Sequence, residues 1–222
     1  MENQLQRGAA GYIKGIFGTI FLFILSNIPL TVFIVLNTDK KPFSLAENAV
    51  VLGLMVACIG LSFYYLAKKN VLWMDLAWVN KSNLLLFIVG YVAIFASTKL
   101  LAALGMNSTS NGNAIMDSLN GSNTVLFIAL ITIVAPILEE CVYRGGIMGI
   151  VFSSRPLLGV FATSILFCLA HTPDSLLAFA NYFISGFIFA FIYYRSRRLE
   201  VGMALHLFNN AVALIMVSLG FN

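Results

Sequence analysis

The sequence has little charge: Lys, Arg, Asp and Glu make up only 10% of its 222 residues, whereas 60% are hydrophobic. Soluble domains carry about 25% charged residues, so this composition excludes an ordinary soluble globule. The mean hydropathy of +0.93 indicates an integral membrane protein. The net charge of +4 is not gathered into a basic patch, so we expect no nucleic-acid partner.

Several familiar catalytic arrangements are also missing. The three cysteines, Cys58, Cys141 and Cys168, stand far apart in apolar runs, which excludes a CxxC motif or a disulfide framework and predicts small buried thiols. No serine or cysteine has an obvious paired base. The sequence also contains neither a glycine-rich phosphate cradle nor an HExxH motif.

What the chain has instead is a series of long apolar runs. They are Ile16–Leu36, Ala49–Leu66, Leu84–Leu104, Thr124–Phe152, Leu157–His171, Leu176–Tyr194 and Val201–Leu219. These runs predict an all-α, polytopic transmembrane bundle of about seven helices, with an eighth, short helix also compatible. Since no small-residue cleavage site stands out near the first run, we expect this span to be retained rather than removed as a signal peptide.

The fourth run is too long for one straight span. It contains Pro136 and the pair Gly145-Gly146, so we predict a kink or a break into two helices there. Before it lies Met106–Asn123, which is rich in Asn, Ser and Gly and is predicted to be a solvated loop. We therefore divide the one membrane domain into residues 1–123, with three helices and this outer loop, and residues 124–222.

The distribution of Lys and Arg predicts the orientation in the membrane. With seven spans, most of them fall on the side of the N-terminus, whereas Met106–Asn123 and the C-terminus lack them. Because Lys and Arg collect on the cytoplasmic side, we expect a cytoplasmic N-terminus and an external C-terminus in a multi-pass cell-membrane protein.

Two carboxylates and an arginine interrupt the fourth run, at Glu139, Glu140 and Arg144. A carboxylate in the middle of a membrane helix costs at least ~2.5–3.5 kcal/mol, so such residues indicate function. Glu140 and Arg144 are four residues apart and can form a forked ion pair. Glu139 is turned about 100° away by the helical period and is left free to face another group.

The only two histidines, His171 and His206, lie in or at the ends of apolar runs. His171 follows Phe167 by one helical turn, and Asn210 follows His206 by one turn, so each pair shares a helix face. Polar contacts that hold helices together would be the simplest interpretation. It would have to explain the Glu pair, both histidines and the amide together. Simple spans place the histidines at different depths, which predicts tilted, broken or offset helices.

One carboxylate, two imidazoles and a carboxamide suit the activation of water for attack on an amide carbonyl. The carboxylate would take the proton, and imidazole and amide N–H groups would stabilise the oxyanion. Alternatively, Glu139, His171 and His206 could hold a zinc ion with an open water position. Both alternatives predict hydrolysis of a peptide bond.

Three motifs in this order also resemble those of the CAAX prenyl protease and bacteriocin-processing family of intramembrane proteases, also called Abi proteins. They are Glu139-Glu140-x-x-x-Arg144, Phe167-x-x-x-His171 and His206-x-x-x-Asn210. The resemblance covers the chain from Thr124 to the C-terminus and implies that residues 124–222 are the catalytic core. The first three helices match no pattern that we can name.

The resemblance also implies roles. Glu139 would activate water with Glu140 and Arg144 as its supporting ion pair, and His171 would complete the site with His206 and Asn210, which would act on the oxyanion. Members are commonly labelled metalloproteases, but the need for a metal is disputed, and metal-independent water activation is equally compatible with this sequence.

The expected partners are the lipid bilayer and a peptide or protein substrate. Bacterial relatives are linked to the processing of peptide pheromones and bacteriocins and to self-immunity, and this small chain with short loops looks bacterial. A membrane-embedded or amphipathic peptide is therefore a better substrate than a prenylated protein. Two other functions stay open: a non-catalytic immunity or scaffold protein that binds a peptide or partner, and a small transporter with a proton relay.

Overall fold

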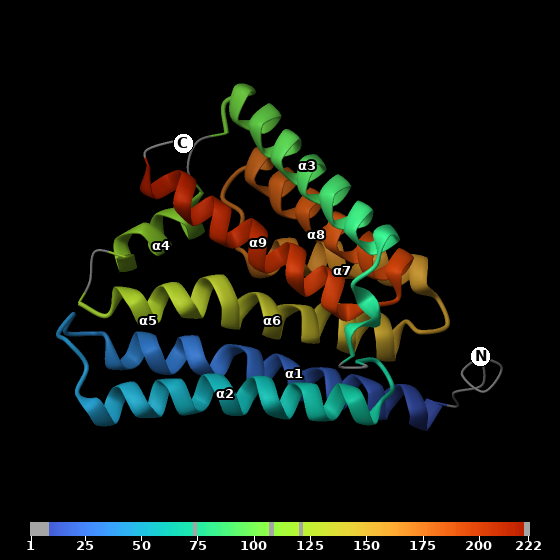
Figure 1. The fold of residues 1–222 in the computed structure, drawn as a ribbon, viewed down its shortest axis with the longest axis horizontal. Coiled ribbons are helices and arrows are strands. Elements are labelled where there is room, and N and C mark those ends of the chain that lie inside the picture. The colour runs from blue at the N-terminus through green and yellow to red at the C-terminus, as the bar shows by residue number, and fades with distance from the viewer. Residues whose placement is uncertain (1–8, 73–74, 107–108, 120–121, 220–222) are drawn as a thin grey trace.

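The computed structural model describes residues 9–72, 75–106, 109–119 and 122–219. In these residues the regular elements are all helices, which confirms the predicted all-α membrane fold (Figure 1). The predicted retention of the first span depends partly on residues 1–8, which lie outside the described residues, as do residues 107, 108, 120 and 121 of the predicted loop. The three cysteines are free and buried, as expected.

Six described helical segments are long and apolar enough to cross a membrane. They are α1 (Ala9–Leu36), α2 (Leu45–Lys68), α3 (Lys81–Ala103), the segment Thr124–Val151, α8 (Leu176–Ser196) and α9 (Leu199–Ser218). The fifth predicted run, Leu157–His171, forms α7 (Pro156–Ala170), which has only 15 residues and is shorter than a membrane span. A short 3₁₀ helix, η2 (Leu76–Trp78), precedes α3.

The segment Thr124–Val151 does not break into two helices, contrary to one of the predicted alternatives. It runs on through α5 (Thr124–Ala129), η3 (Leu130–Val134), α6 (Ala135–Glu140) and η4 (Cys141–Val151), in which η3 and η4 are wound as π-helix. The irregularity is therefore in the winding rather than in the continuity of the helix.

Pro136 and the glycine pair each have a place in this winding. In a π-helical turn the N–H of residue 136 would bond the carbonyl of Ile131, but proline has no N–H. The side chain of Asn210 donates to that carbonyl instead, at 3.1 Å. A Cβ on Gly145 would lie 2.7 Å from Leu66 Cδ1, and one on Gly146 would lie 3.0 Å from the Thr19 side chain. The two glycines thus permit α1 and α2 to pack closely on η4.

The helices form two groups (Figure 1). Helices α1 and α2 pack beside the segment from η3 to η4, whereas α3, α8 and α9 pack against one another and run obliquely to the first group. Helix α7 packs mainly on α8 and on η4. The candidate site residues, on α6, η4, α7 and α9 and directly after α7, therefore lie on helices that pack together where the two groups join.

The predicted loop Met106–Asn123 contains a helix, α4 (Ser110–Leu119), so the prediction of a loop throughout was wrong. The start of this helix is capped from a distance: the carboxylate of Asp174 accepts from the Ser110 hydroxyl and, at 2.7 Å, from its backbone N–H. The same two donors hold the pKa of Asp174 below its usual value. Thr109 also caps the helix locally, because its hydroxyl oxygen accepts from the Gly112 N–H at 3.1 Å, so the sequence did contain one N-cap signal.

We predict that Gly90→Val weakens the packing of α3. A Cβ there would lie 2.4 Å from Ile192 Cδ1 and 2.9 Å from Leu205 Cδ2, two buried side chains. Such overpacking typically costs about 1–3 kcal/mol. Thermal unfolding of the detergent-purified protein measures the effect.

The matched control is Gly53→Val in α2, where an added Cβ meets nothing within 4 Å. Equal melting temperatures for the two variants would contradict the close approach of α3 to α8 and α9.

Candidate active site

A fully buried ion pair lies at the centre of the candidate site. Glu140 and Arg144 both have no exposed side-chain surface, and Arg144 Nη1 donates to Glu140 Oε1 at 2.9 Å. The pair is not forked as we predicted, because Nη2 donates to the backbone carbonyl of Gly186 at 2.8 Å instead. The guanidinium also lies over the rings of Phe167 and Phe189, at 5.2 and 5.5 Å from their centroids. Charge, two hydrogen bonds and ring faces offset part of the cost of burying Arg144, whose Nε has no hydrogen-bond partner among the described residues.

The same Glu140 oxygen binds a histidine from another helix. His206 Nδ1 lies 3.0 Å from Glu140 Oε1. An ionised carboxylate can only accept hydrogen bonds, so Nδ1 of His206 carries a proton and donates a hydrogen bond to Glu140. The ring stacks on Phe189, with centroids 4.4 Å apart. The orientation of His206 is therefore determined by a carboxylate that Arg144 neutralises.

Held in this way, His206 presents its other nitrogen to Glu139. Nε2 lies 3.8 Å from Glu139 Oε2. That oxygen is buried and has no hydrogen-bond partner among the described residues, although 28% of the Glu139 side chain is exposed. As the helical period predicts, Glu139 faces away from Arg144 and toward another polar group. A water molecule could bond both atoms, because their separation is too long for a direct hydrogen bond.

Phe167 brings the second histidine to this site. Its ring contacts His171 at 4.4 Å and His206 at 5.6 Å between ring centroids. His171 lies just after the end of α7, where its Nδ1 donates to the Phe167 carbonyl at 2.8 Å. The Nε2 atom of neutral His171 is then an acceptor. Both histidine rings therefore lie beside the ring of Phe167, despite the difference in depth that simple spans imply.

Asn210 lies one turn after His206 on α9. One of its amide N–H groups bonds the Ile131 carbonyl that Pro136 leaves free. An asparagine amide has two N–H groups, so one is left for another acceptor.

Three further residues shape the site, and the sequence did not single them out. Tyr182 stacks on His171, with ring centroids 4.7 Å apart, and its hydroxyl bonds Thr109 Oγ1 at 2.8 Å, just before α4. Gly186 supplies the carbonyl for Arg144, and a Cβ on it would lie 3.0 Å from Phe167. A Cβ on Gly202 would lie 3.0 Å from Glu140 Oε2. Of these three residues, only Gly202 could have been noticed in the sequence, because it lies four residues, about one helical turn, before His206.

The predicted metal ligands do not fit a metal centre as they are arranged. Throughout the part of the chain that the structure describes, no group of three or more His, Cys, Asp or Glu side chains could hold a metal ion. The Nδ1 atoms of His206 and His171 are bound to Glu140 and to a backbone carbonyl, so only their Nε2 atoms could serve as ligands.

Comparisons with known proteins agree with the motif pattern. The family model "Type II CAAX prenyl endopeptidase Rce1-like" matches residues 121–212. The UPF0177 protein YajF of Lactococcus lactis is 30% identical over 82% of this chain and 92% of its own length. The UPF0177 protein YvdC of the same species is 27% identical over 89% of this chain and 76% of its own.

A relative whose name states an activity matches a shorter stretch of this chain. The membrane-embedded CAAX protease MroQ of Staphylococcus aureus is 33% identical over 40% of this chain and 38% of its own length. No solved structure matches this chain.

We predict that Arg144→Ala lowers the folded yield as well as any activity. It leaves Glu140 charged and buried without its cation, which typically costs about 3–5 kcal/mol. The monodisperse fraction in size-exclusion chromatography measures the yield, and Arg155→Ala, at an exposed position, is the control.

The double variant Glu140→Gln/Arg144→Met removes both charges and should recover much of the yield. A normal yield for Arg144→Ala alone would show that the pair has no structural role.

Proposed function

Because this chain belongs to the Rce1-like family of type II CAAX prenyl endopeptidases, we propose that it is an intramembrane endopeptidase in which Glu139 activates the attacking water. A membrane protease of this family sits in the lipid bilayer and acts on a peptide or protein. The observation that carries the proposal is the Glu139 Oε2 atom. It is buried, has no hydrogen-bond partner among the described residues and lies 3.8 Å from His206 Nε2.

The proposed reaction begins with a water molecule hydrogen-bonded to Glu139. The carboxylate takes a proton as the water oxygen attacks the carbonyl carbon of the scissile peptide bond. Negative charge then develops on the carbonyl oxygen, and a nearby N–H donor stabilises it. Collapse of the tetrahedral intermediate breaks the C–N bond, and the proton held by Glu139 passes to the leaving amine.

His206 and Asn210 are the proposed donors to the oxyanion. With Nδ1 bonded to Glu140, His206 can donate from Nε2 only as an imidazolium. The charges of that imidazolium and Arg144 would balance those of Glu139 and Glu140. The free N–H of Asn210, one turn further along α9, would supply the second hydrogen bond. His171 would accept a hydrogen bond from the substrate or the leaving group through Nε2.

An apolar pocket next to the site suits a membrane-associated substrate. It has a volume of about 260 Å³ and is lined by Thr19, Ile20, Phe23, Val142, Tyr143, Ile147, Leu166 and Ala170. Tyr143 is four residues after Glu139, so the pocket opens one helical turn from the carboxylate. We propose that it holds an apolar side chain of an amphipathic or membrane-embedded peptide.

For the biological role we propose bacterial peptide processing or bacteriocin self-immunity. In the proposed topology the N-terminus is cytoplasmic, and residues 124–222 form the catalytic core. An external C-terminus requires the 15-residue α7 to cross the membrane as a seventh span, because the six longer segments alone would return the C-terminus to the cytoplasmic side. A non-catalytic immunity or scaffold protein would use the same cavity to bind a peptide, and catalysis distinguishes the two.

We predict that Glu139→Gln lowers cleavage by at least about a hundredfold while leaving the protein folded, because Gln cannot take the proton from water. The assay is the cleavage of a quenched-fluorescent peptide library by detergent-purified protein, with and without a strong chelator. Glu47→Gln is the matched control, because Gln also supports the capping box in which Glu47 takes part.

Equal cleavage by wild type and Glu139→Gln would refute the proposed role of Glu139. If the wild type cleaves no peptide but binds a candidate peptide as tightly as Glu139→Gln does, the scaffold function is favoured. Proton-coupled uptake of a solute into vesicles would favour a transporter.

We also predict that Tyr182 positions His171. Tyr182→Leu removes the stacked ring and should lower kcat by up to about a hundredfold, because small misplacements of reacting groups are that costly. Tyr182→Phe keeps the ring and loses only the bond to Thr109, so it should retain most of the activity, as should Thr109→Val. Steady-state kinetics with the best peptide separate kcat from KM; equal kcat losses for Tyr182→Leu and Tyr182→Phe would contradict a role for the ring.

A further inference from the structure

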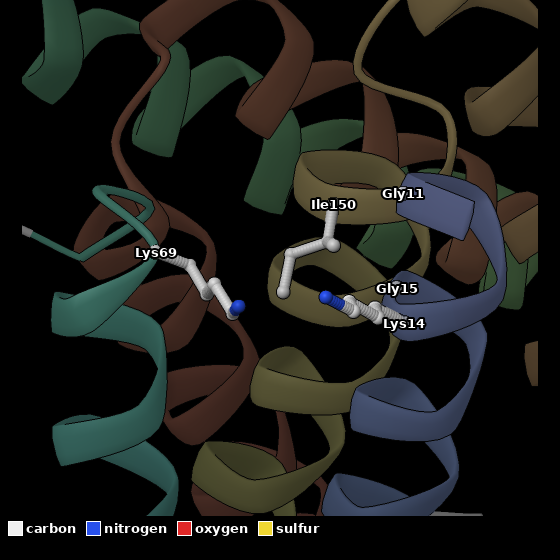
Figure 2. A pocket seen from close by; sticks show the side chains of 5 residues that line it. All are labelled: Gly11, Lys14, Gly15, Lys69 and Ile150. Carbon is white, nitrogen blue, oxygen red and sulfur yellow. The ribbon is translucent and has the colours of Figure 1, made fainter. Parts of the chain in front are cut away.

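A small pocket away from the candidate active site contains two lysines. It lies between the start of α1, the residue that follows α2 and the end of η4, and its volume is about 230 Å³ (Figure 2). Gly11, Lys14, Gly15, Lys69 and Ile150 line it. Figure 2 shows the two ammonium groups pointing into the same space from opposite sides, with Ile150 beside them.

The walls of this pocket come from close helix packing. A Cβ on Gly15 would lie 3.2 Å from Ile150 Cγ2, so α1 and η4 approach each other closely there. Because Gly11 and Gly15 have no side chains, the backbone of α1 forms part of the wall next to Lys14. Opposite, the Lys69 ammonium lies 5.5 Å over the ring of Tyr65.

No described residue forms an ion pair that balances the charge of the two lysines, Lys14 and Lys69. Two ammonium groups that converge without a counter-ion repel each other, and a negatively charged group between them would remove that repulsion. The pocket thus has the electrostatic character of an anion site.

Its position relative to the membrane indicates which anion. The first candidate span begins at Gly11 and the second ends at Lys68, so the pocket lies at the boundary of the hydrocarbon region. On the predicted topology this is the cytoplasmic boundary, where basic pockets between helices bind the head groups of anionic lipids. The apolar Ile150 and the bare backbone suit the glycerol part of a lipid.

We propose that this pocket binds the phosphate group of an anionic phospholipid. The volume is sufficient for a phosphate, since a water molecule in the liquid takes about 30 Å³. The binding is independent of the proposed peptidase reaction and needs none of its residues. A bound head group would hold α1, α2 and η4 together at this end of the bundle.

Native mass spectrometry of the full-length, detergent-purified protein tests this proposal. Phosphatidylglycerol should be retained in preference to phosphatidylcholine. Lys14→Gln/Lys69→Gln should weaken phosphatidylglycerol binding by about thirtyfold, because each ammonium near the head group contributes about fivefold. Lys14→Arg/Lys69→Arg keeps both charges and should bind nearly as tightly as the wild type.

The control is Lys68→Gln/Lys99→Gln, which removes the same charge elsewhere. Lys68 neighbours Lys69 in sequence, but its ammonium lies over Tyr64 and it does not line the pocket. Equal losses in the two glutamine double variants, or no loss in either, would overturn the proposal. Full displacement of the lipid by millimolar inorganic phosphate would also overturn it, because free phosphate would then be the occupant.

Discussion

The ion pair between Glu140 and Arg144 is the interaction on which the rest of this structure depends. Both side chains are completely buried in a protein that is otherwise largely apolar. Buried charges are stable only when paired and hydrogen-bonded, and here the partners come from three other parts of the chain: His206, the Gly186 carbonyl and the rings of Phe167 and Phe189. The pair thereby links α7, α8 and α9 to η4, and Glu139 is left with an oxygen that has no hydrogen-bond partner among the described residues.

Much of this arrangement could be predicted from spacing in the sequence. Long apolar runs predict membrane helices because few other structures satisfy the backbone in lipid. The interval of four residues between Glu140 and Arg144 predicts their contact, and the helical period predicts that Glu139 faces elsewhere. Both inferences need only the geometry of one helix, and the structure agrees with both.

Features that depend on contacts between distant residues could not be predicted in this way. Helix α4 has a local cap in Thr109, but its first residue is also held by Asp174, which is distant in sequence and leaves no local pattern. Pro136 suggested a break in the helix. The helix continues because the carbonyl that Pro136 leaves free accepts a hydrogen bond from Asn210 on another helix, which the sequence does not reveal. The second hydrogen bond of Arg144 goes to a backbone carbonyl, and a carbonyl has no signature in sequence. The glycines beside Glu140 and Phe167 matter for their lack of a side chain, which only packing reveals.

The most direct test of this account is the protonation of the imidazole nitrogens. The protein has only two histidines, so ¹⁵N-histidine labelling gives two sets of signals, which the His171→Gln variant assigns. Long-range ¹H–¹⁵N correlation spectra of the detergent-purified protein distinguish the two ring nitrogens of each. If Glu140 orients His206, its Nδ1 carries a hydrogen-bonded proton at neutral pH. A His206 with bare Nδ1 and a proton only on Nε2 would contradict the account, because the ring could not then donate to Glu140.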